Sequence, residues 1–471
     1  MKKIKFGTGG FRAIIGEDFN KENIQKICQA ISNIINTKNL KKQICIGYDN
    51  RFMSEDFARW CAEVFAGNGI NVELFDRATT TPVAMYATKN SGNDYGVMIT
   101  ASHNPYMYNG IKVFTSCGKD ADLTETAEIE AETYKVVDVK TVDYETALNS
   151  KIKLVSYLEE YVDSVIRLTN LDGYVHDIKV VFDAKYGSSV EELDMMCEKI
   201  KLKNYDILNL QRDAFFGFEP PAPKEDNIDK LIAQVKTTKA QVGFALDADG
   251  DRLAVVDEQG NYIDNNYILA IVYYFLVKYC GKKGHSVKNV ATSNILDMVS
   301  EKFGYECKEV PVGFKYVSSA LLEHNAVVGG ESSGGLAIEG HILGKDSLIA
   351  IALCLQAMAV MKKPFSEILS EVKDFVGGYT KVILDKEFSY TEQQKQYMDN
   401  VLFSQKQTPN HRYEVEKIVF KDYIKVFYKN GNWSLIRFSG TEPILRIFAE
   451  ADTTEQTNQL ISDWQQMLGL N

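Results

Sequence analysis

Long apolar runs are missing from this sequence of 471 residues. No segment approaches the ~20 uninterrupted apolar residues that cross a membrane. The N-terminus, MKKIKFGTGGFRAIIGEDF, starts with basic residues but lacks the apolar stretch of a secretory signal. None of the eight cysteines forms a CxxC pair and most lie in apolar stretches, so we expect reduced, buried thiols rather than a disulfide framework. These absences predict a cytoplasmic protein without a membrane partner.

An excess of positive charge is missing as well. The chain has 64 acidic and 53 basic residues, a net charge of −11, so we expect no nucleic-acid partner. An anionic substrate is not excluded, because arginines and lysines can cluster locally in an acidic protein. The length suits about three or four domains, and the 45% of apolar residues can fill large cores. We expect a monomer or a homodimer.

A weak repeat runs through much of the chain. Residues 43–76, 177–208 and 287–314 each begin with an apolar β-branched run, turn at a small polar group, continue as an amphipathic helix and end in a second strand. The first turn is Asp49-Asn50-Arg51. Strand–helix–strand units build mostly parallel sheets, with ligands at the carboxyl ends of the strands. We predict three related α/β domains.

The last hundred residues follow another pattern. TKVIL, KIVF, YIKVFYKNGNWSLIRF and ILRIFAEA read as strands, and Asn430-Gly431 predicts a type I′ hairpin turn. A final helix is expected from about Thr453, which can cap it while Gln456 reaches back. This pattern predicts a smaller α+β domain. The expected domains are residues 1–150, 151–256, 257–376 and 377–471.

The stretch VMITASHNP ends a predicted buried strand at Ser102, on a turn stiffened by Pro105. Such a serine could close a turn, attack an acyl group or carry a phosphoryl group. The GxSxG flanks of an acyl-transfer serine are missing. The following YMYNGIKVF places Lys112 on a returning strand that faces the serine loop, and a phosphate would require such a cation. This favours a phosphoryl carrier over a capping serine.

Three aspartates alternate in ALDADGDRLAVVD, directly after another predicted strand. Carboxylates this close repel one another by about 4 kcal/mol per pair, for a separation of ~4 Å and an effective dielectric constant of ~20. A positive group should therefore lie among them, and hard oxygen ligands suit Mg²⁺ or Ca²⁺. An EF-hand is excluded because Arg252 stands where the sixth-position glycine is needed and strands flank the loop. A solvated acidic turn is the alternative, and the metal site is favoured over it.

Two further loops combine glycine with polar side chains. In VVGGESSGGLAIEGHILGKDS, Glu331 and Ser333 could bind sugar hydroxyls, with His341 and Lys345 as a second cluster; a plain turn is the alternative. In LIRFSGTEPILRIF, the guanidinium pair, two hydroxyls and free amide match the oxygens of a phosphate, and a hairpin turn with a surface salt bridge is the alternative. The residues of this last set are Arg437, Ser439, Gly440, Thr441 and Arg446.

Together, in this order, the four loops resemble those of the α-D-phosphohexomutases. The resemblance spans the chain and rests on TASHNP…NGIK, DADGDR and RFSGTEP…R, with GTGGFR at the start. It implies four domains around a central cleft: three related α/β units with mixed sheets, and a C-terminal α+β domain like the TATA-binding protein. These would be, in order, the phosphoserine-loop, metal-loop, sugar-binding and phosphate-binding domains.

The resemblance also implies a role for each matching residue. Ser102 would be the phosphoserine, with His103 beside it. Mg²⁺ would be bound by the phosphoserine oxygen and by Asp247, Asp249 and Asp251. The remaining roles would be proton transfer and charge neutralisation by Arg12 and Lys112; substrate binding by Arg252, Lys315, Glu331, Ser333, His341 and Lys345; and phosphate binding by Arg437, Ser439, Gly440, Thr441 and Arg446.

The implied reaction interconverts hexose 1-phosphate and hexose 6-phosphate through a 1,6-bisphosphate, with glucose 1,6-bisphosphate as the activator. Three positions depart from the family pattern: Ser347 replaces a glycine, Phe438 replaces a common proline, and Gly335 stands where some relatives carry a histidine. The His341 and Lys345 cluster is typical of phosphoglucomutases and favours glucose. Phosphomannomutase and phosphoglucosamine mutase are the alternatives within the family.

Two other classes were weighed against the mutase. A phosphoserine-type sugar phosphatase would also use a serine and metals, but usually with several histidine ligands, and the six histidines of this chain are scattered. A phosphosugar-binding protein without catalysis would not need both Ser102 and three metal-binding aspartates. The sequence therefore predicts a mutase.

Overall fold

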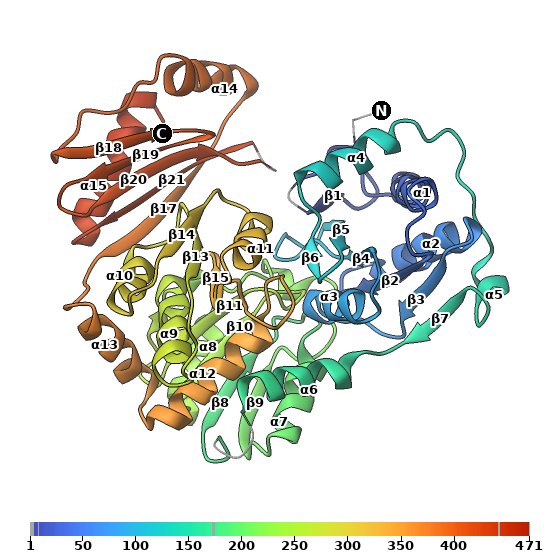
Figure 1. Ribbon diagram of the computed structural model, residues 1–471, viewed down its shortest axis with the longest axis horizontal. Coiled ribbons are helices and arrows are strands. Elements are labelled where there is room, and N and C mark those ends of the chain that lie inside the picture. The colour runs from blue at the N-terminus through green and yellow to red at the C-terminus, as the bar shows by residue number, and fades with distance from the viewer. Residues whose placement is uncertain (1–3, 8, 172–174, 441–442, 471) are drawn as a thin grey trace. The chain divides into compact units, whose positions relative to one another are not determined.

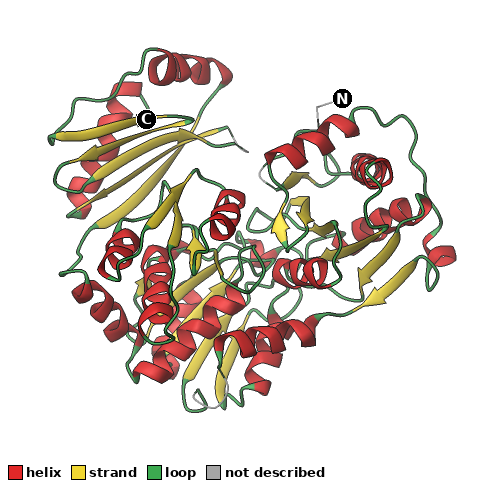
Figure 2. Cartoon of the chain, viewed as in Figure 1, coloured by secondary structure: helices red, strands yellow, loops and turns green. Residues whose placement is uncertain are grey.

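The computed structural model describes residues 4–7, 9–171, 175–440 and 443–470. The chain divides into two compact units, Met1–Val372 and Lys373–Asn471. The first unit contains three separate sheets and the second contains one (Figure 1). In the first unit strands alternate with helices, as Figure 2 shows, whereas the strands of the second unit follow one another more closely.

The first sheet has the order β1-β5-β4-β2-β3-β7, and β6 pairs with β5. Strand β2 is parallel to β3 and β4, and β3 is parallel to β7. Strand β5 is antiparallel to both β1 and β4. The strands are β1 Gly10–Ile14, β2 Gln43–Tyr48, β3 Asn71–Phe75, β4 Tyr95–Ile99, β5 Tyr108–Thr115, β6 Lys119–Asp120 and β7 Ile152–Val155. The helices around them are α1 Lys21–Thr37, α2 Ser54–Gly67, α3 Thr81–Asn90, α4 Leu123–Thr133, α5 Tyr144–Ala147 and α6 Leu158–Thr169.

The second sheet has the order β12-β11-β10-β8-β9, and the third has the order β14-β13-β15-β16. The elements of the second are β8 Lys179–Asp183, α7 Val190–Lys199, β9 Asn204–Leu208, α8 Asp229–Thr238, β10 Val242–Leu246, β11 Leu253–Asp257 and β12 Tyr262–Ile263, with short 3₁₀ turns at Phe216–Phe218 and Glu225–Asn227. Those of the third are α9 Asn265–Lys278, β13 Ser286–Asn289, α10 Ile295–Lys302, β14 Cys307–Val310, α11 Phe314–Glu323, β15 Val328–Gly330, β16 Leu336–Ile338, α12 Ser347–Met361 and α13 Phe365–Phe375.

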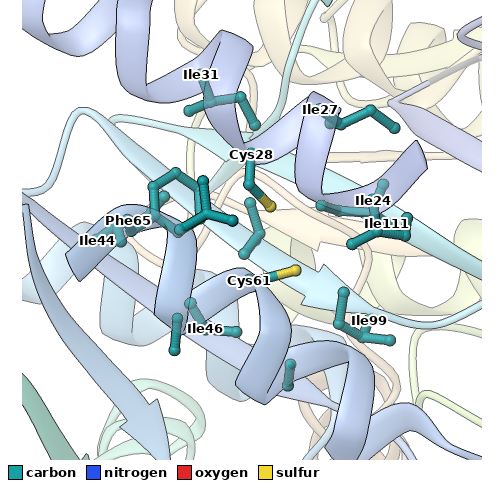
Figure 3. Packing of buried hydrophobic residues seen from close by; sticks show 14 of the residues in the cluster. Ile24, Ile27, Cys28, Ile31, Ile44, Ile46, Cys61, Phe65, Ile99 and Ile111 are labelled. Carbon is teal, nitrogen blue, oxygen red and sulfur yellow. The ribbon is translucent and has the colours of Figure 1, made fainter. Parts of the chain in front are cut away.

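The predicted repeat is confirmed in all three sheets. The units β2-α2-β3, β8-α7-β9 and β13-α10-β14 each consist of two parallel strands joined by one helix. Helices α1 and α2 each bury an apolar face against the first sheet. Figure 3 shows α1 contributing Ile27 and Cys28, and α2 contributing Cys61 and Phe65, to a core that also holds Ile44 of β2. Burial of these faces, at about 25 cal/mol per Å² of apolar surface, explains why the amphipathic period predicted the helices.

The second unit is the predicted α+β domain. Its antiparallel sheet has the order β17-β21-β20-β19-β18. Its elements are β17 Val382–Ser389, α14 Glu392–Asp399, a π-helical turn Asn400–Ser404, β18 Val415–Phe420, β19 Tyr423–Tyr428, β20 Trp433–Phe438, β21 Ile444–Ala451 and α15 Thr454–Leu468. Residues of α14, the π-helical turn and α15 share one apolar core with the sheet.

Two local predictions for this unit need correction. The β19–β20 hairpin is not closed by a type I′ turn at Asn430-Gly431. Such a turn needs a positive φ at both residues, and of these two only Gly431 has one, of 78°. The Asn430 side chain instead accepts from the Asn432 amide at 3.1 Å. Helix α15 does begin after Thr453, whose hydroxyl accepts from the Gln456 amide at 3.2 Å. Gln456 Oε1, however, is buried without a hydrogen bond among the described residues, so the reciprocal half of the capping box is not formed.

All eight cysteines are free thiols, and five of them are buried, as the sequence predicted. In the described part of the chain, no individual helix is both long and apolar enough to cross a bilayer. Helices α12 and α13 reach that length and composition only as a pair, bent by 84°. Helix α12 is buried along most of its length.

Candidate active site

The three α/β units of the first compact unit share one local construction. Asp49 directly follows β2, and Asp183 and Asn289 are the last residues of β8 and β13. The Oδ1 atoms of these three residues accept from the backbone amide two residues later, at 3.0, 3.0 and 2.9 Å. The parallel neighbours of these strands are β4, β10 and β15, and each leads into one of the loops predicted to be functional. The serine, aspartate and glutamate loops therefore follow the carboxyl ends of equivalent strands, where α/β sheets bind ligands.

Ser102 lies on the loop after β4, fully buried and in the left-handed region with φ of 52°. For a residue other than glycine this conformation costs about 1–2 kcal/mol. Its amide donates to Thr100 Oγ1 at 2.9 Å, and its hydroxyl donates to Asp247 Oδ2 at 2.8 Å. His103 Nδ1 is 3.4 Å from the same hydroxyl. The strained backbone thus aims the Ser102 hydroxyl at the aspartate loop of the second sheet.

The aspartate loop begins directly after β10. Asp247, Asp249 and Asp251 are all buried, and one oxygen from each lies within 4.8 Å of the others. Asp247 Oδ1 accepts from the amides of Asp251 and Arg252 at 2.9 and 3.0 Å, which leaves Oδ2 for Ser102. Burial raises the pKa of Asp247 well above its ordinary value, and the charges of Asp249 and Asp251 raise it further.

Lysine side chains form ion pairs with the other two carboxylates, Asp249 and Asp251. Lys112 Nζ, on β5, donates to Asp249 at 2.6 Å and to Asp251 at 2.8 Å, and Lys345 Nζ donates to Asp251 at 3.1 Å. Thr81, at the start of α3, donates its hydroxyl to Asp249 Oδ2 at 2.6 Å. Burial and Asp251 act to raise the pKa of Asp249, but Lys112 outweighs them and the pKa lies below its ordinary value. The lysine expected to face the serine loop is thus bonded to the aspartates.

The residues present fit a divalent cation. Asp249 Oδ1 is buried and has no hydrogen-bond partner among the described residues, so a carboxylate oxygen is left for a further ligand. Three carboxylates supply the hard oxygen donors that Mg²⁺ prefers. Strands β10 and β11 flank the loop, as expected for a site that is not an EF-hand.

Arg12 and His103 border the serine loop. Arg12, on β1, donates Nη1 to the Asn104 side chain at 2.9 Å. Burial lowers the pKa of His103 well below its ordinary value, and Arg252 and Arg12 act in the same direction. His103 is therefore a neutral imidazole at neutral pH. Arg252 is nearby, with Nε 3.9 Å from Asp251 Oδ1.

The glutamate loop follows β15. Glu331 Oε1 accepts from the side-chain amide of Asn289 at 2.9 Å and from the Gly313 amide at 3.0 Å, and Ser333 is exposed. A Cβ atom at Gly335 would lie only 2.1 Å from Cδ of Lys345. The glycine noted as a departure from some relatives therefore leaves room for Lys345 to reach Asp251.

Two predicted substrate-binding residues have other neighbours. His341 is buried, with Nε2 2.6 Å from Asp346 Oδ2, and Tyr161 donates to both oxygens of Asp346 at 2.9 Å. His341 thus pairs with Asp346, whereas Lys345 bonds Asp251 of the aspartate loop. Lys315 is buried at the start of α11; burial lowers its pKa, and Asp120 opposes this shift.

The fourth loop, between β20 and β21, belongs to the second compact unit. Arg437 and Arg446 are directly opposite each other on these strands. Two like charges in cross-strand register are unfavourable unless an anion lies near, and Glu387 of β17 pairs with Arg446 at 3.0 Å. Ser439 donates its amide to the Ile444 carbonyl at 2.8 Å, and Gly440 is exposed. Thr441 lies outside the described residues.

The sequence reasoning missed four residues that hold these loops. Thr81 and Thr100 bond Asp249 and the Ser102 amide, Asn289 bonds Glu331, and Arg51 contacts the serine loop. Arg51 and Asn289 both belong to strand-end turns of the repeat. A comparison of those turns would have been the signal for these two residues.

The sequence models of four domains match this chain in order. They are phosphoglucomutase/phosphomannomutase α/β/α domain I over residues 3–139, domain II over 159–260, domain III over 264–375, and the C-terminal domain over 391–464. The matched ranges cover all four candidate loops.

Known proteins resemble the chain along its whole length. A Thermococcus kodakarensis protein named phosphoglucomutase/phosphomannomutase is 28% identical over 97% of this chain and 96% of its own. A Methanosphaera stadtmanae protein named probable phosphoglucosamine mutase is 30% identical over 98% and 97%. A crystal structure of a phosphoglucomutase/phosphomannomutase family protein from Burkholderia thailandensis has a TM-score of 0.81 at 21% identity, with coverage of 98% and 96%, and shares the fold.

Proposed function

The chain belongs to the phosphoglucomutase/phosphomannomutase family and is a phosphohexomutase, and from that premise we propose that it interconverts glucose 1-phosphate and glucose 6-phosphate through a phosphoserine at Ser102. The observation that carries this proposal is the hydrogen bond from the buried, left-handed Ser102 to Asp247 of the carboxylate triad. A serine that only closed a turn would need neither the strained backbone nor the three aspartates.

The reaction consists of two phosphoryl transfers. In the first, the bond between phosphorus and Ser102 Oγ breaks while a bond forms to the free hydroxyl oxygen of the hexose phosphate, and that hydroxyl gives up its proton. The bisphosphate then reorients in the site. Its other phosphoryl group is transferred to Ser102 Oγ, the bond between that phosphorus and the sugar oxygen breaks, and the sugar oxygen takes up a proton. Arg12 and Lys112 supply positive charge and assist proton transfer, and His103 lies beside the Ser102 hydroxyl.

The aspartates are proposed to hold Mg²⁺ together with a phosphoserine oxygen. A phosphate on Ser102 adds a charge of about −1.5 to −2 at neutral pH. When bound, Mg²⁺ would polarise the phosphoryl oxygens as a Lewis acid. Lys112 and Lys345 already neutralise Asp249 and Asp251, which limits the repulsion between the triad and the phosphoserine.

The sugar and the second phosphate are assigned to the other two loops. We propose that Glu331 and Ser333 bind sugar hydroxyls, with Arg252, Lys315 and Lys345 as cations toward the substrate and His341 supporting their loop through Asp346. The non-reacting phosphate is assigned to Arg437, Ser439, Gly440, Thr441 and Arg446. The opposed guanidinium groups of Arg437 and Arg446 support an anion site.

Glucose is the proposed hexose, and glucose 1,6-bisphosphate the proposed activator. Support comes from the Lys345 side chain, which crosses Gly335 where a histidine would collide with it. Glucosamine phosphate is the second candidate, because the relative at 30% identity carries the name of a phosphoglucosamine mutase. A coupled assay with the 1-phosphates of glucose, mannose, glucosamine and a pentose ranks them by kcat/KM.

The phosphoserine itself is tested by mass. Incubation with glucose 1,6-bisphosphate should add one phosphate to the intact protein, mapped to Ser102 and absent from Ser102→Ala. That variant should fold and bind substrate but lose nearly all turnover, whereas Ser150→Ala, in a turn before β7, should behave as wild type. Near-normal turnover by Ser102→Ala, without phosphorylation of a neighbouring residue, would falsify the mechanism.

A further inference from the structure

Arg51 is fully buried, and its guanidinium group converges on the serine loop. Nη1 donates to the carbonyl oxygens of Pro105 and Tyr108, each at 3.0 Å. Nη2 donates to the carbonyl oxygens of Ser102 and Asn104. One side chain from the turn after β2 therefore binds three carbonyls of the loop between β4 and β5 and the carbonyl of the first residue of β5.

This contact set requires an arginine. The guanidinium group presents several N–H donors in a rigid plane, whereas a lysine has three donors on one nitrogen and cannot spread them over carbonyls on both ends of the loop. One of the bound carbonyls belongs to Ser102 itself, whose φ of 52° has to be maintained by its surroundings. Arg51 therefore sets the peptide plane that follows the left-handed residue.

Two further groups hold Arg51 in place. Asp49 Oδ2 lies 3.3 Å from Arg51 Nε, and the same oxygen accepts from Thr100 Oγ1 at 2.6 Å. On the other side, the ring of Phe216 lies 4.9 Å from the Arg51 guanidinium carbon. Phe216 lies between β9 and β10, in the second α/β domain of the first compact unit, and itself has a positive φ, of 51°. The serine loop is thus held through an arginine that residues of the first and of the second α/β domain contact, both within the first compact unit.

We propose that Arg51 is a positioning residue for phosphoryl transfer, which orients Ser102 by binding backbone carbonyls of its loop, and that Phe216 completes this arrangement from the second α/β domain. The inference rests on the proposed function of Ser102. Among the described residues, Arg51 has no hydrogen bond or ion pair with the triad or with the groups assigned to the sugar. Its loss should therefore change the rate of transfer much more than the binding of the hexose phosphate.

The test is Arg51→Lys in the full chain, which keeps the positive charge beside Asp49 but loses the planar donor set. We expect kcat to fall by about 100-fold, the size of effect expected from a displacement of about 1 Å in the reacting group, with KM within about threefold of wild type. Amide hydrogen exchange of residues 102–108 should become faster. Phe216→Leu should lower kcat by about two- to fivefold, as expected for loss of a cation–π contact.

Arg59→Lys is the matched control. Arg59 also pairs with a carboxylate, Glu55 at 2.6 Å, and lies 5.3 Å from an aromatic ring, but on the exposed face of α2. It should leave kcat and exchange unchanged. If Arg51→Lys folds and both its kcat and its amide hydrogen exchange equal those of wild type, the inference is overturned. If Arg51→Lys does not fold, a wild-type kcat and wild-type exchange in Phe216→Leu overturn it. If the wild-type protein converts no hexose phosphate while exchange still rises in Arg51→Lys, the proposed function fails and the positioning of the loop stands.

Discussion

Ser102 combines an unfavourable backbone conformation with three compensating contacts. Its amide is held by Thr100, its carbonyl by Arg51 and its hydroxyl by Asp247. A left-handed serine persists only where its surroundings determine it this strongly. The position of the hydroxyl is therefore set before any substrate arrives, and rate enhancement can come from positioning and charge rather than from new covalent chemistry.

Asp249 provides a test of the metal site at the same scale. Asp249→Asn keeps the shape of the side chain but removes a carboxylate from the triad, and Lys112 keeps its bond to Asp251. We predict Mg²⁺-dependent turnover that this variant reduces by at least about 100-fold, because less charge remains to hold the metal.

The measurement is kcat against Mg²⁺ concentration, with thermal unfolding as a check on the fold. The matched control is Asp229→Asn, an exposed carboxylate at the start of α8. Full turnover of the wild-type protein in excess EDTA would contradict the prediction.

Helix α13 is tied to α9 by one carboxylate. Glu371 accepts from Lys363 at 2.7 Å, from Tyr274 at 2.6 Å, and from Lys278 and Tyr279, each at 3.0 Å. Burial acts to raise its pKa, but these donors outweigh burial and lower the pKa to about 2. The ionised form of Glu371 is thus more stable, relative to the protonated form, in the folded chain than in the unfolded chain.

The linkage fixes the sign of the pH dependence. The ordinary pKa is 4.5 and the folded value about 2, so the stabilisation is complete above pH 4.5 and disappears as the pH falls toward 2. Glu371→Gln should lower the free energy of unfolding by about 1 kcal/mol at neutral pH, a modest value because solvent screens the network.

The difference from wild type should shrink below pH 4.5 in urea titrations of both proteins. Glu367→Gln, on the exposed face of the same helix, controls for the loss of one charge. A difference that stayed constant between pH 7 and pH 3 would show that the charge of Glu371 does not stabilise the fold.

The whole molecule distributes its candidate groups over four sheets in two compact units. The serine, aspartate and glutamate loops belong to the first unit and the two opposed arginines to the second. A bisphosphate that reacts at either end needs one site for the reacting phosphate and one for the other. The proposed function gives the first task to Ser102 and the second to Arg437 and Arg446.

Arg437→Ala tests this division. Because the proposed anchor holds the non-reacting phosphate in both orientations of the bisphosphate, KM should rise for glucose 1-phosphate and for glucose 6-phosphate alike. The rise should be about tenfold or more, as expected for a charged hydrogen bond of about 1.5–3 kcal/mol. Initial rates measured in both directions give the two values.

Arg412→Ala is the control, because it also removes an arginine from the second unit. Arg412 makes a bidentate salt bridge to Asp463, at 2.7 Å for each contact. A defect limited to one direction, beyond what the equilibrium constant requires, would assign Arg437 to another role.

The sequence by itself determined the parts of this protein that depend on neighbouring residues. The strand–helix–strand units and the place of each loop followed from apolar periods and from turn residues, because both act over a few positions along the chain. The triad after β10 was evident for the same reason, since Asp247, Asp249 and Asp251 belong to one short turn.

Only the tertiary structure decided which distant groups meet. Lys112 bonds Asp249 and Asp251 rather than the serine loop, and His341 pairs with Asp346. Arg51 binds four carbonyls between Ser102 and Tyr108, some fifty positions further along. Even the turn at Gly431 depended on a side-chain bond that its two-residue signature did not contain. These contacts form because sheet order brings separate strand ends together, and sheet order is a property of the folded core rather than of any local pattern.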